Sequence, residues 1–342
     1  MIITMLGYTG SGKTTYMSAM SQLFVDGDVQ GFYLRDRPGI QDNKFFIRKA
    51  FKGVNTIFTE NRFPDGTSSS TTMYLSLFRS IDYNHNDYII DIDWIDYRGG
   101  MIMDIAHGNQ EDDVAQLSTV LMATDVVLVF VDATILKNET SEYKIKSLIG
   151  ANEIVNVLND IYNIKPIEIV FLLSKSDSDL IDIGTDLQML KSRAEKAFNM
   201  FFIKNNLEPS NFQFIPVGSV GINRVKTSII VEPKTRQKVY SVSIIDDPLP
   251  YNIHISFAYA LEKCIVGAMR NKEDEFDKIT KRLKDKESHY GWFQKFWDSL
   301  LFGSRTRNEI IDIKNDLNNK HLEILQLNPY RDALSSIWKG RI

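Results

Sequence analysis

A glycine-rich loop of fixed spacing near the start of the chain restricts the fold more than any other feature. Residues 7–14, GYTGSGKT, match the pattern GxxxxGK[ST] at every fixed position. A short apolar segment, residues 2–6, predicts a buried strand before the loop, and residues 13–24 have a helical pattern after it. Glycines let such a loop turn its backbone N–H groups inward, and the following helix adds the positive end of its dipole. The context therefore predicts a phosphate-binding loop between the first strand and the first helix.

Each residue type in this loop has a predicted role. Backbone N–H groups would bind phosphate oxygens, Lys13 would reach the β- and γ-phosphates, and the Thr14 hydroxyl would coordinate Mg²⁺. The predicted phosphate-binding residues of the loop are Gly7, Tyr8, Thr9, Gly10, Ser11, Gly12, Lys13, Thr14 and Thr15. Because ATPases, kinases and GTPases share this pattern, it does not decide which nucleotide binds.

Strand-like and helix-like segments alternate over about the first 270 residues. Residues 125–131 and 166–173 are β-branched apolar runs, typical of parallel strands that helices cover on both faces. Further strands are predicted at 72–79, 88–95 and 212–216, and helices at 113–123, 141–162, 186–205 and 253–269. This alternation predicts an α/β fold of three layers with a mainly parallel central sheet, as in P-loop NTPases.

Two segments, 25–60 and 223–250, interrupt the alternation and are interpreted as insertions into a domain of residues 1–270. The first is locally basic, and the second contains a predicted β-hairpin with a charged turn. Residues 271–342 are predicted to form a helical C-terminal extension, because the composition becomes highly charged there. Within it, 286–307 would form a helix with one broad apolar face. That face would pack on the rest of the chain, which is the favoured interpretation, or bind a protein partner, a second copy or a membrane surface.

The composition excludes several classes of protein. The net charge of −4 shows no basic excess that would favour nucleic acid. The single cysteine, Cys264, cannot form an internal disulfide, which fits a reducing compartment. There is no signal-peptide pattern, and no apolar run approaches the roughly 20 residues that span a bilayer. We therefore expect a cytoplasmic protein, with peripheral membrane association left open.

The ends of later predicted strands carry further candidate ligands. In residues 96–99, DYRG, Asp96 would hold Mg²⁺ through water, and the Gly99 N–H would meet the γ-phosphate. In residues 172–177, LLSKSD, Asp177 would accept two hydrogen bonds from the N1–H and amine of guanine, which adenine does not offer. The stem of Lys175 would pack over the purine ring. In residues 216–220, PVGSV, a backbone N–H of Ser219 or Val220 would contact guanine O6. Ligands bind at these strand ends in parallel sheets.

In this order, the motifs resemble those of the TRAFAC-class GTPases, over roughly residues 1–270. Residues 61–67, NRFPDGT, are similar to the PxxT switch segment of large bacterial GTPase-like proteins, and residues 247–254 resemble the lead into their last helix. The resemblance implies a switch that binds GTP or GDP with Mg²⁺ and controls an unknown protein partner. It also implies that Thr67 is the switch threonine at the metal, with Thr71 and Thr72 as alternatives.

The chain departs from that family at two positions. Ser174 stands where the guanine motif usually has Asn or Thr, so guanine specificity would rest mainly on Asp177. Gly100 stands where Ras-like members have a glutamine that orients water, so hydrolysis would be slow or depend on a partner. Lys13, Arg98 and Gly99 are the candidate catalytic residues. The alternatives are a P-loop ATPase or nucleotide kinase, and a nucleotide-stabilised interaction module with little hydrolysis.

Overall fold

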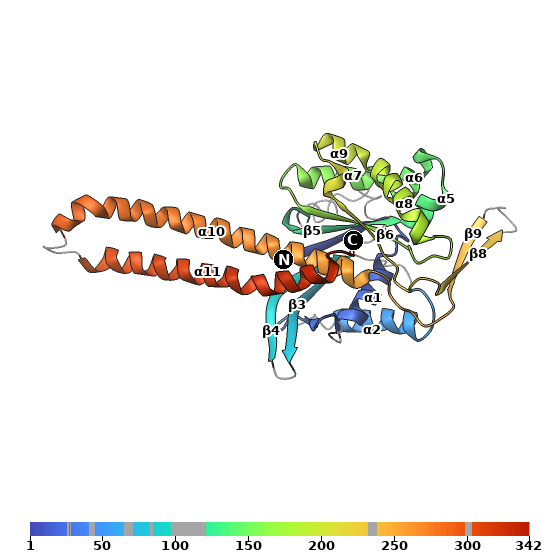
Figure 1. Cartoon of the computed structure of the whole chain (residues 1–342), viewed down its shortest axis with the longest axis horizontal. Helices are drawn as coiled ribbons and strands as arrows, with labels where there is room; N and C mark the ends of the chain where they lie inside the picture. Colours follow the sequence, from blue (N-terminus) through green and yellow to red (C-terminus); the bar gives the residue numbers. More distant parts are fainter. Residues whose placement is uncertain are drawn as a thin grey trace. The chain divides into compact units, whose positions relative to one another are not determined.

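One seven-stranded sheet forms the centre of the first 260 residues (Figure 1). In chain order, its strands are β1 (Ile2–Gly7), β2 (Phe32–Asp36), β3 (Thr71–Asp82), β4 (His85–Asp96), β5 (Val126–Asp132), β6 (Glu168–Ser174) and β7 (Gln213–Pro216). Their spatial order is β2-β3-β4-β1-β5-β6-β7. Strands β4, β1, β5, β6 and β7 are parallel, whereas β2 and β3 add an antiparallel edge. The predicted α/β class with a mainly parallel sheet is confirmed.

The structure is a computed structural model that describes most of the chain. The described residues are 1–25, 27, 29–40, 45–64, 71–82, 85–96, 119, 121–231, 238–297 and 303–341. The chain divides into two units, Met1–Ala260 with Ile337–Ile342, and Leu261–Ser336. Among the described helices, none combines the length and the apolar character that crossing a membrane requires.

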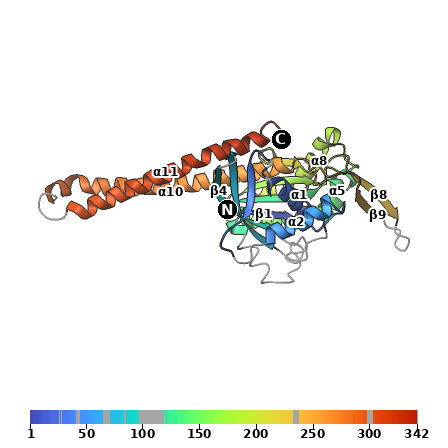
Figure 2. The ribbon, with the colours of Figure 1, turned by 90° about the horizontal axis from the view of Figure 1, so that it is seen from below.

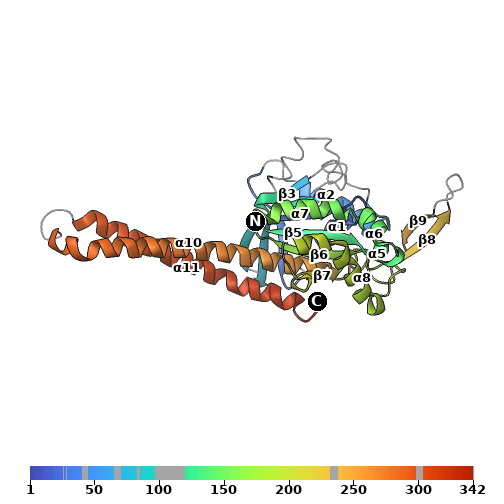
Figure 3. The same ribbon diagram turned by 90° about the horizontal axis from the view of Figure 1, so that it is seen from above.

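Helices cover both faces of the sheet. One face carries α1 (Lys13–Val25), α2 (Phe45–Phe58) and the first turns of α10 (Ile253–Trp297) (Figure 2). The other face carries α5 (Ala133–Asn138), α6 (Glu142–Ile149), α7 (Ala151–Tyr162), α8 (Ile183–Ala197) and α9 (Asn199–Lys204) (Figure 3). A short 3₁₀ helix, η1 (Pro209–Asn211), precedes β7. A separate antiparallel pair, β8 (Val225–Val231) and β9 (Lys238–Ile244), forms the hairpin predicted within 223–250.

The central strands are continuous apolar runs because both of their faces are buried. All seven residues of β5 are buried. Val127 and Val129 join an apolar cluster with residues of α6 to α9. Phe130 faces the opposite layer, where its ring meets Tyr16 of α1 edge to face at 5.1 Å. The Tyr16 hydroxyl is hydrogen-bonded to Ser256 of α10 at 2.9 Å, so α1, which follows the glycine-rich loop, is held between β5 and α10.

The prediction of one helix over 141–162 is wrong at Gly150, where α6 ends and α7 begins. Gly150 has a φ of +64°, a left-handed conformation that ends helices and that glycine adopts without strain. The ring of Tyr8 also approaches this glycine so closely that a Cβ there would lie 2.5 Å from Tyr8 Cδ2. The glycine-rich loop therefore approaches the helix layer at Gly150, the residue at which α6 ends and α7 begins.

The predicted helix over 186–205 is also two helices, α8 and α9, which meet at Phe198. The φ of −97° and ψ of +11° at Phe198 lie outside the helical region. Its side chain is fully buried, with its ring centroid 5.0 Å from that of Phe171 in β6. The predicted insertion at 25–60 supplies β2, which pairs with β3, and α2, which packs against α1, so it is part of the layered fold.

The second unit, Leu261–Ser336, consists of the greater part of α10 and of α11 (Gly303–Trp338). The Nζ atom of Lys272 pairs with Glu323, and that of Lys320 lies 3.0 Å from Glu275, which requires the two helices to be antiparallel. The predicted domain boundary at 270 falls inside α10, which continues to Trp297. The prediction of one helix over 286–307 is wrong, because α10 ends at Trp297 and α11 begins at Gly303. The side chains of 286–307, on which the predicted apolar face depends, lie outside what the structure describes.

Candidate functional site

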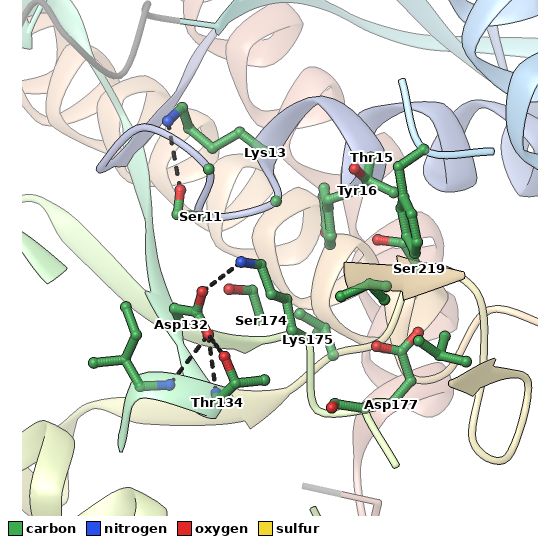
Figure 4. Close-up of a pocket in the computed structure, with 18 of the residues that line it drawn as sticks. Ser11, Lys13, Thr15, Tyr16, Asp132, Thr134, Ser174, Lys175, Asp177 and Ser219 are labelled. Carbon is green, nitrogen blue, oxygen red and sulfur yellow. Dashed lines mark hydrogen bonds and ion pairs between the residues drawn. The ribbon is translucent and has the colours of Figure 1, made fainter. Parts of the chain in front are cut away.

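A pocket of about 620 Å³ lies at the carboxyl ends of the parallel strands (Figure 4). This volume is within the range of small-molecule sites, roughly 300–1,000 Å³. The lining comes from the glycine-rich loop, the ends of β5 and β6, the loop after β7, the β8–β9 hairpin and the segment after α2. It includes Thr9, Gly10, Ser11, Gly12, Lys13, Thr14, Thr15, Phe63, Pro64, Asp132, Ser174, Lys175, Asp177, Ser219 and Val242. The pocket therefore brings together residues that the sequence predicts to bind phosphate and residues predicted to bind a base.

The glycine-rich loop makes a tight turn into α1. The Ser11 N–H donates to the Tyr8 carbonyl at 3.1 Å, and the Tyr16 N–H donates to the Gly12 carbonyl at 2.9 Å. Gly12 has a φ of +90°, which residues with a side chain rarely adopt and glycine adopts freely. The turn places the N-terminus of α1, with its favourable dipole for an anion, at the wall of the pocket.

The Lys13 ammonium group folds back onto this loop. Its Nζ atom donates to the Gly7 carbonyl at 2.6 Å and to the Tyr8 carbonyl at 3.2 Å, and the residue is only 5% exposed. Burial lowers the pKa of Lys13 from its usual 10.5 to about 8, and the charge of Asp96 opposes part of that shift. The loop thus holds a buried cation beside the N-terminus of a helix, an arrangement suited to an anionic ligand.

Asp96 and Thr14 are the predicted metal ligands within the described residues. Asp96 ends β4, pairs with Met5 of β1 and is fully buried. Mg²⁺ prefers oxygen ligands and keeps several waters, so one or two protein oxygens are sufficient. A carboxylate and a hydroxyl fit this requirement in their chemistry. In the part of the chain that is described, no group of three or more His, Cys, Asp and Glu side chains offers another metal site.

The end of β6 places Ser174 and Lys175 toward the neighbouring strand β5 and the loop. Ser174 Oγ donates to the Val131 carbonyl at 3.2 Å, and its Cβ lies 3.8 Å from the point where a Cβ on Gly12 would stand. The Nζ atom of Lys175 lies 2.5 Å from Oδ2 of Asp132 (Figure 4). Ser174 is therefore bonded to β5 and lies beside Gly12 of the loop, and Asp132 fixes the direction of the Lys175 side chain.

Asp132 is a site residue that the sequence reasoning missed. It is the last residue of β5 and caps α5, because its Oδ1 accepts hydrogen bonds from the Thr134 N–H at 2.9 Å and the Thr134 hydroxyl at 2.6 Å. Its other oxygen pairs with Lys175. The rule that selected Asp96, a carboxylate at the carboxyl end of a buried strand, would also have selected Asp132.

Asp177 is bound by the loop that follows β7. Its Oδ2 accepts hydrogen bonds from the Val220 N–H at 2.8 Å and the Gly221 N–H at 2.9 Å. Burial raises the pKa of the Asp177 carboxyl, and the two N–H groups oppose part of this shift. A Cβ on Gly218 would lie 2.4 Å from the Cβ of Asp177, so glycine is required beneath it. Since the Val220 N–H is bonded to Asp177, Ser219 is the better placed of the two predicted O6 donors.

Some predicted site residues cannot be placed with these. Three of them lie outside the described residues, namely Thr67, Arg98 and Gly99, and so does Gly100, where the chain departs from the family pattern. Of the alternative switch threonines, Thr71 and Thr72 begin β3, and Thr71 pairs across the sheet with Asp96. Arg62, which lies within the predicted switch segment 61–67, has a side chain that is 69% exposed and pairs with Glu60 at 3.2 Å.

No protein-family model matches the sequence, and no curated protein sequence matches it. The functional inference therefore rests on the order of the motifs along this chain and on one pocket that residues of the glycine-rich loop, the Ser174–Asp177 segment and Ser219 all line.

Proposed function

We propose that this protein is a P-loop GTPase-like switch that binds GTP or GDP with Mg²⁺. One observation carries the proposal: the glycine-rich loop with Lys13, the Ser174–Asp177 segment and Ser219 line one pocket of about 620 Å³. The loop would bind the phosphates of a guanine nucleotide, and the other two segments would bind its base. The phosphates would lie at the N-terminus of α1, and the base would lie between Lys175 and Asp177.

Lys13 would exchange its partners when the nucleotide binds. Its ammonium group would leave the carbonyls of Gly7 and Tyr8, and donate to the β- and γ-phosphate oxygens. Thr14 and Asp96 would hold Mg²⁺, which neutralises phosphate charge when it is bound. Hydrolysis would consist of attack by water on the γ-phosphorus. The bond from phosphorus to the bridging oxygen would break, GDP would leave with its electrons, and the protons of the water would go to inorganic phosphate and to solvent. We propose slow hydrolysis, because glycine at position 100 has no side chain to orient that water.

The switch property would come from the segment that follows α2. Phe63 and Pro64 line the pocket and lead directly into residues 65–67, which carry the predicted switch threonine. A γ-phosphate would hold such a segment through Mg²⁺, and its loss would release it. A protein partner would distinguish the two states of this segment.

The decisive experiment is a titration of GTP, GDP, ATP and XTP against the wild type and Asp177→Asn. The asparagine keeps an oxygen for the N–H groups of Val220 and Gly221, but its amide would donate toward the base. Xanthine has a carbonyl where guanine has its amine, so the variant should lose affinity for GTP and gain affinity for XTP. Equal affinity for ATP and GTP in the wild type, or an unchanged preference in the variant, would refute guanine recognition. Single-turnover hydrolysis then separates a slow GTPase from a module that only binds.

A further inference from the structure

The β8–β9 hairpin has a face that borders the same pocket. Val225 and Thr227 of β8 and Val242 of β9 all line it. In the hairpin register, Thr227 pairs with Val242, and Val225 pairs with Ile244. Because side chains alternate along a strand, these four residues share one face, whereas Lys226 is on the other. The hairpin extends away from the seven-stranded sheet (Figure 1), yet residues on this face of it line the pocket.

Hydrogen bonds attach the hairpin to the predicted base-binding segment. Both carboxylate oxygens of Asp179 accept from the Thr227 N–H, at 3.0 and 3.1 Å. The hydroxyls of Ser178 and Thr227 lie 3.4 Å apart. Asp179 and Ser178 directly follow Asp177, so one short segment contacts both the loop after β7 and the hairpin.

A small apolar cluster attaches the same face of the hairpin nearer to its base. Val225 and Ile244 are buried together with Val220 from the loop after β7 and Ile57 from α2, and Phe63 packs against them. The next pair along the hairpin, Thr227 and Val242, is not part of this cluster. Val242 is 44% exposed, although it lines the pocket, so an apolar side chain there still has surface that a ligand would cover.

We propose that the hairpin is the outer wall of the nucleoside end of the site, with Val242 as a contact for the base or ribose and Asp179 as the residue that positions the hairpin. This inference rests on the proposed nucleotide-binding function. The hairpin lies at the nucleoside end because its anchors are Asp179 and Val220, both adjacent to the predicted guanine ligands. It therefore affects affinity for the nucleoside and leaves affinity for the phosphates unchanged.

The test compares two ligands in the full-length protein with Mg²⁺. GDP uses the whole site, whereas inorganic tripolyphosphate uses only the phosphate end. Val242→Ala should raise the Kd for GDP about threefold, because it removes two methyl groups that are already partly exposed. Asp179→Ala should raise it about fivefold by releasing the Thr227 N–H, and Asp179→Asn should retain most of the affinity through its remaining oxygen. The Kd for tripolyphosphate should stay unchanged in all three variants.

Lys226→Ala is the matched control, because it alters the adjacent residue on the opposite face of the same strand. It should bind both ligands as the wild type does. Wild-type affinity for GDP in Val242→Ala and Asp179→Ala would overturn the inference and leave the proposed function intact. An equal loss for GDP and tripolyphosphate would also overturn it, since that outcome indicates a general loss of structure. A wild type that binds tripolyphosphate but no nucleotide overturns the proposed function itself.

Discussion

The buried ammonium group of Lys13 predicts how nucleotide affinity depends on pH. In this structure, burial holds the pKa of Lys13 at about 8. Phosphate oxygens beside the ammonium group would favour its charged form and raise that pKa. The bound state then keeps a proton that the free protein loses above pH 8. Affinity for GDP should therefore be nearly constant below pH 8 and should fall as the pH rises above it.

The size of the effect follows from the charged fraction of Lys13. With a pKa of about 8, the Lys13 side chain carries its charge in about ten-elevenths of the free protein at pH 7. At pH 9, about one-eleventh of the free protein carries that charge. The Kd for GDP should therefore rise about tenfold from pH 7 to pH 9, which corresponds to about 1.4 kcal/mol. Calorimetry at pH 8 in buffers of different ionisation enthalpy should also detect uptake of about half a proton on binding.

Lys13→Arg is the matched control for this prediction, because a guanidinium group keeps its charge throughout the range. Any pH dependence that this variant retains belongs to the nucleotide or to other groups and is subtracted. The reasoning is refuted if the wild-type Kd is flat between pH 7 and pH 9, or if it changes no more than that of Lys13→Arg. Calorimetric proton uptake tests the wild type independently of the variant.

Three further substitutions test individual contacts of the site. Gly218→Ala would put a Cβ 2.4 Å from that of Asp177, so the free energy of unfolding should fall by about 1–3 kcal/mol and the Kd for GTP should rise; urea denaturation and titration check the two effects. Asp132→Asn keeps an acceptor for the cap of α5 but loses the charge paired with Lys175, so stability should change by less than about 1 kcal/mol while the Kd for GDP rises. Wild-type affinity in that variant would contradict the positioning role. Gly150→Ala should cost about 1–3 kcal/mol in urea denaturation, because φ is +64° and the new Cβ would meet an aromatic ring.

The central strands and the glycine-rich loop could be predicted because their signals are local. Strand β5 is an unbroken apolar run, and its burial on both faces requires that pattern. The loop depends on residue types at fixed spacing, so Gly12 and Lys13 were located directly. The sequence pattern did not predict that β3 runs antiparallel to β4. The predicted strands left eight residues between 79 and 88, whereas β3 ends at Asp82 and β4 begins at His85. That short connection requires an antiparallel pair.

Neither helix break appears in the apolar periodicity, although the glycine at position 150 is itself a local signal for a helix end. Gly150 sits against the ring of Tyr8, and Phe198 is held in the core beside Phe171. Apolar spacing continues through both positions, so the sequence pattern predicts one helix in each case. Periodicity records which face of a segment is buried. It does not record where another part of the chain requires the helix to end.

The same distinction explains why the hairpin was predicted but its place in the pocket was not. Alternation along β8 indicates a strand, and the charged turn indicates a hairpin. Its position depends on Asp179 reaching Thr227, a contact across 48 residues, and on the Arg224–Asp246 ion pair at 3.2 Å that joins its two ends. A carboxylate two residues beyond Asp177 is an unremarkable loop residue in the sequence. Only the fold shows that it attaches a strand to the wall of the site, so residues that position a site from outside its motifs have to be sought in the structure.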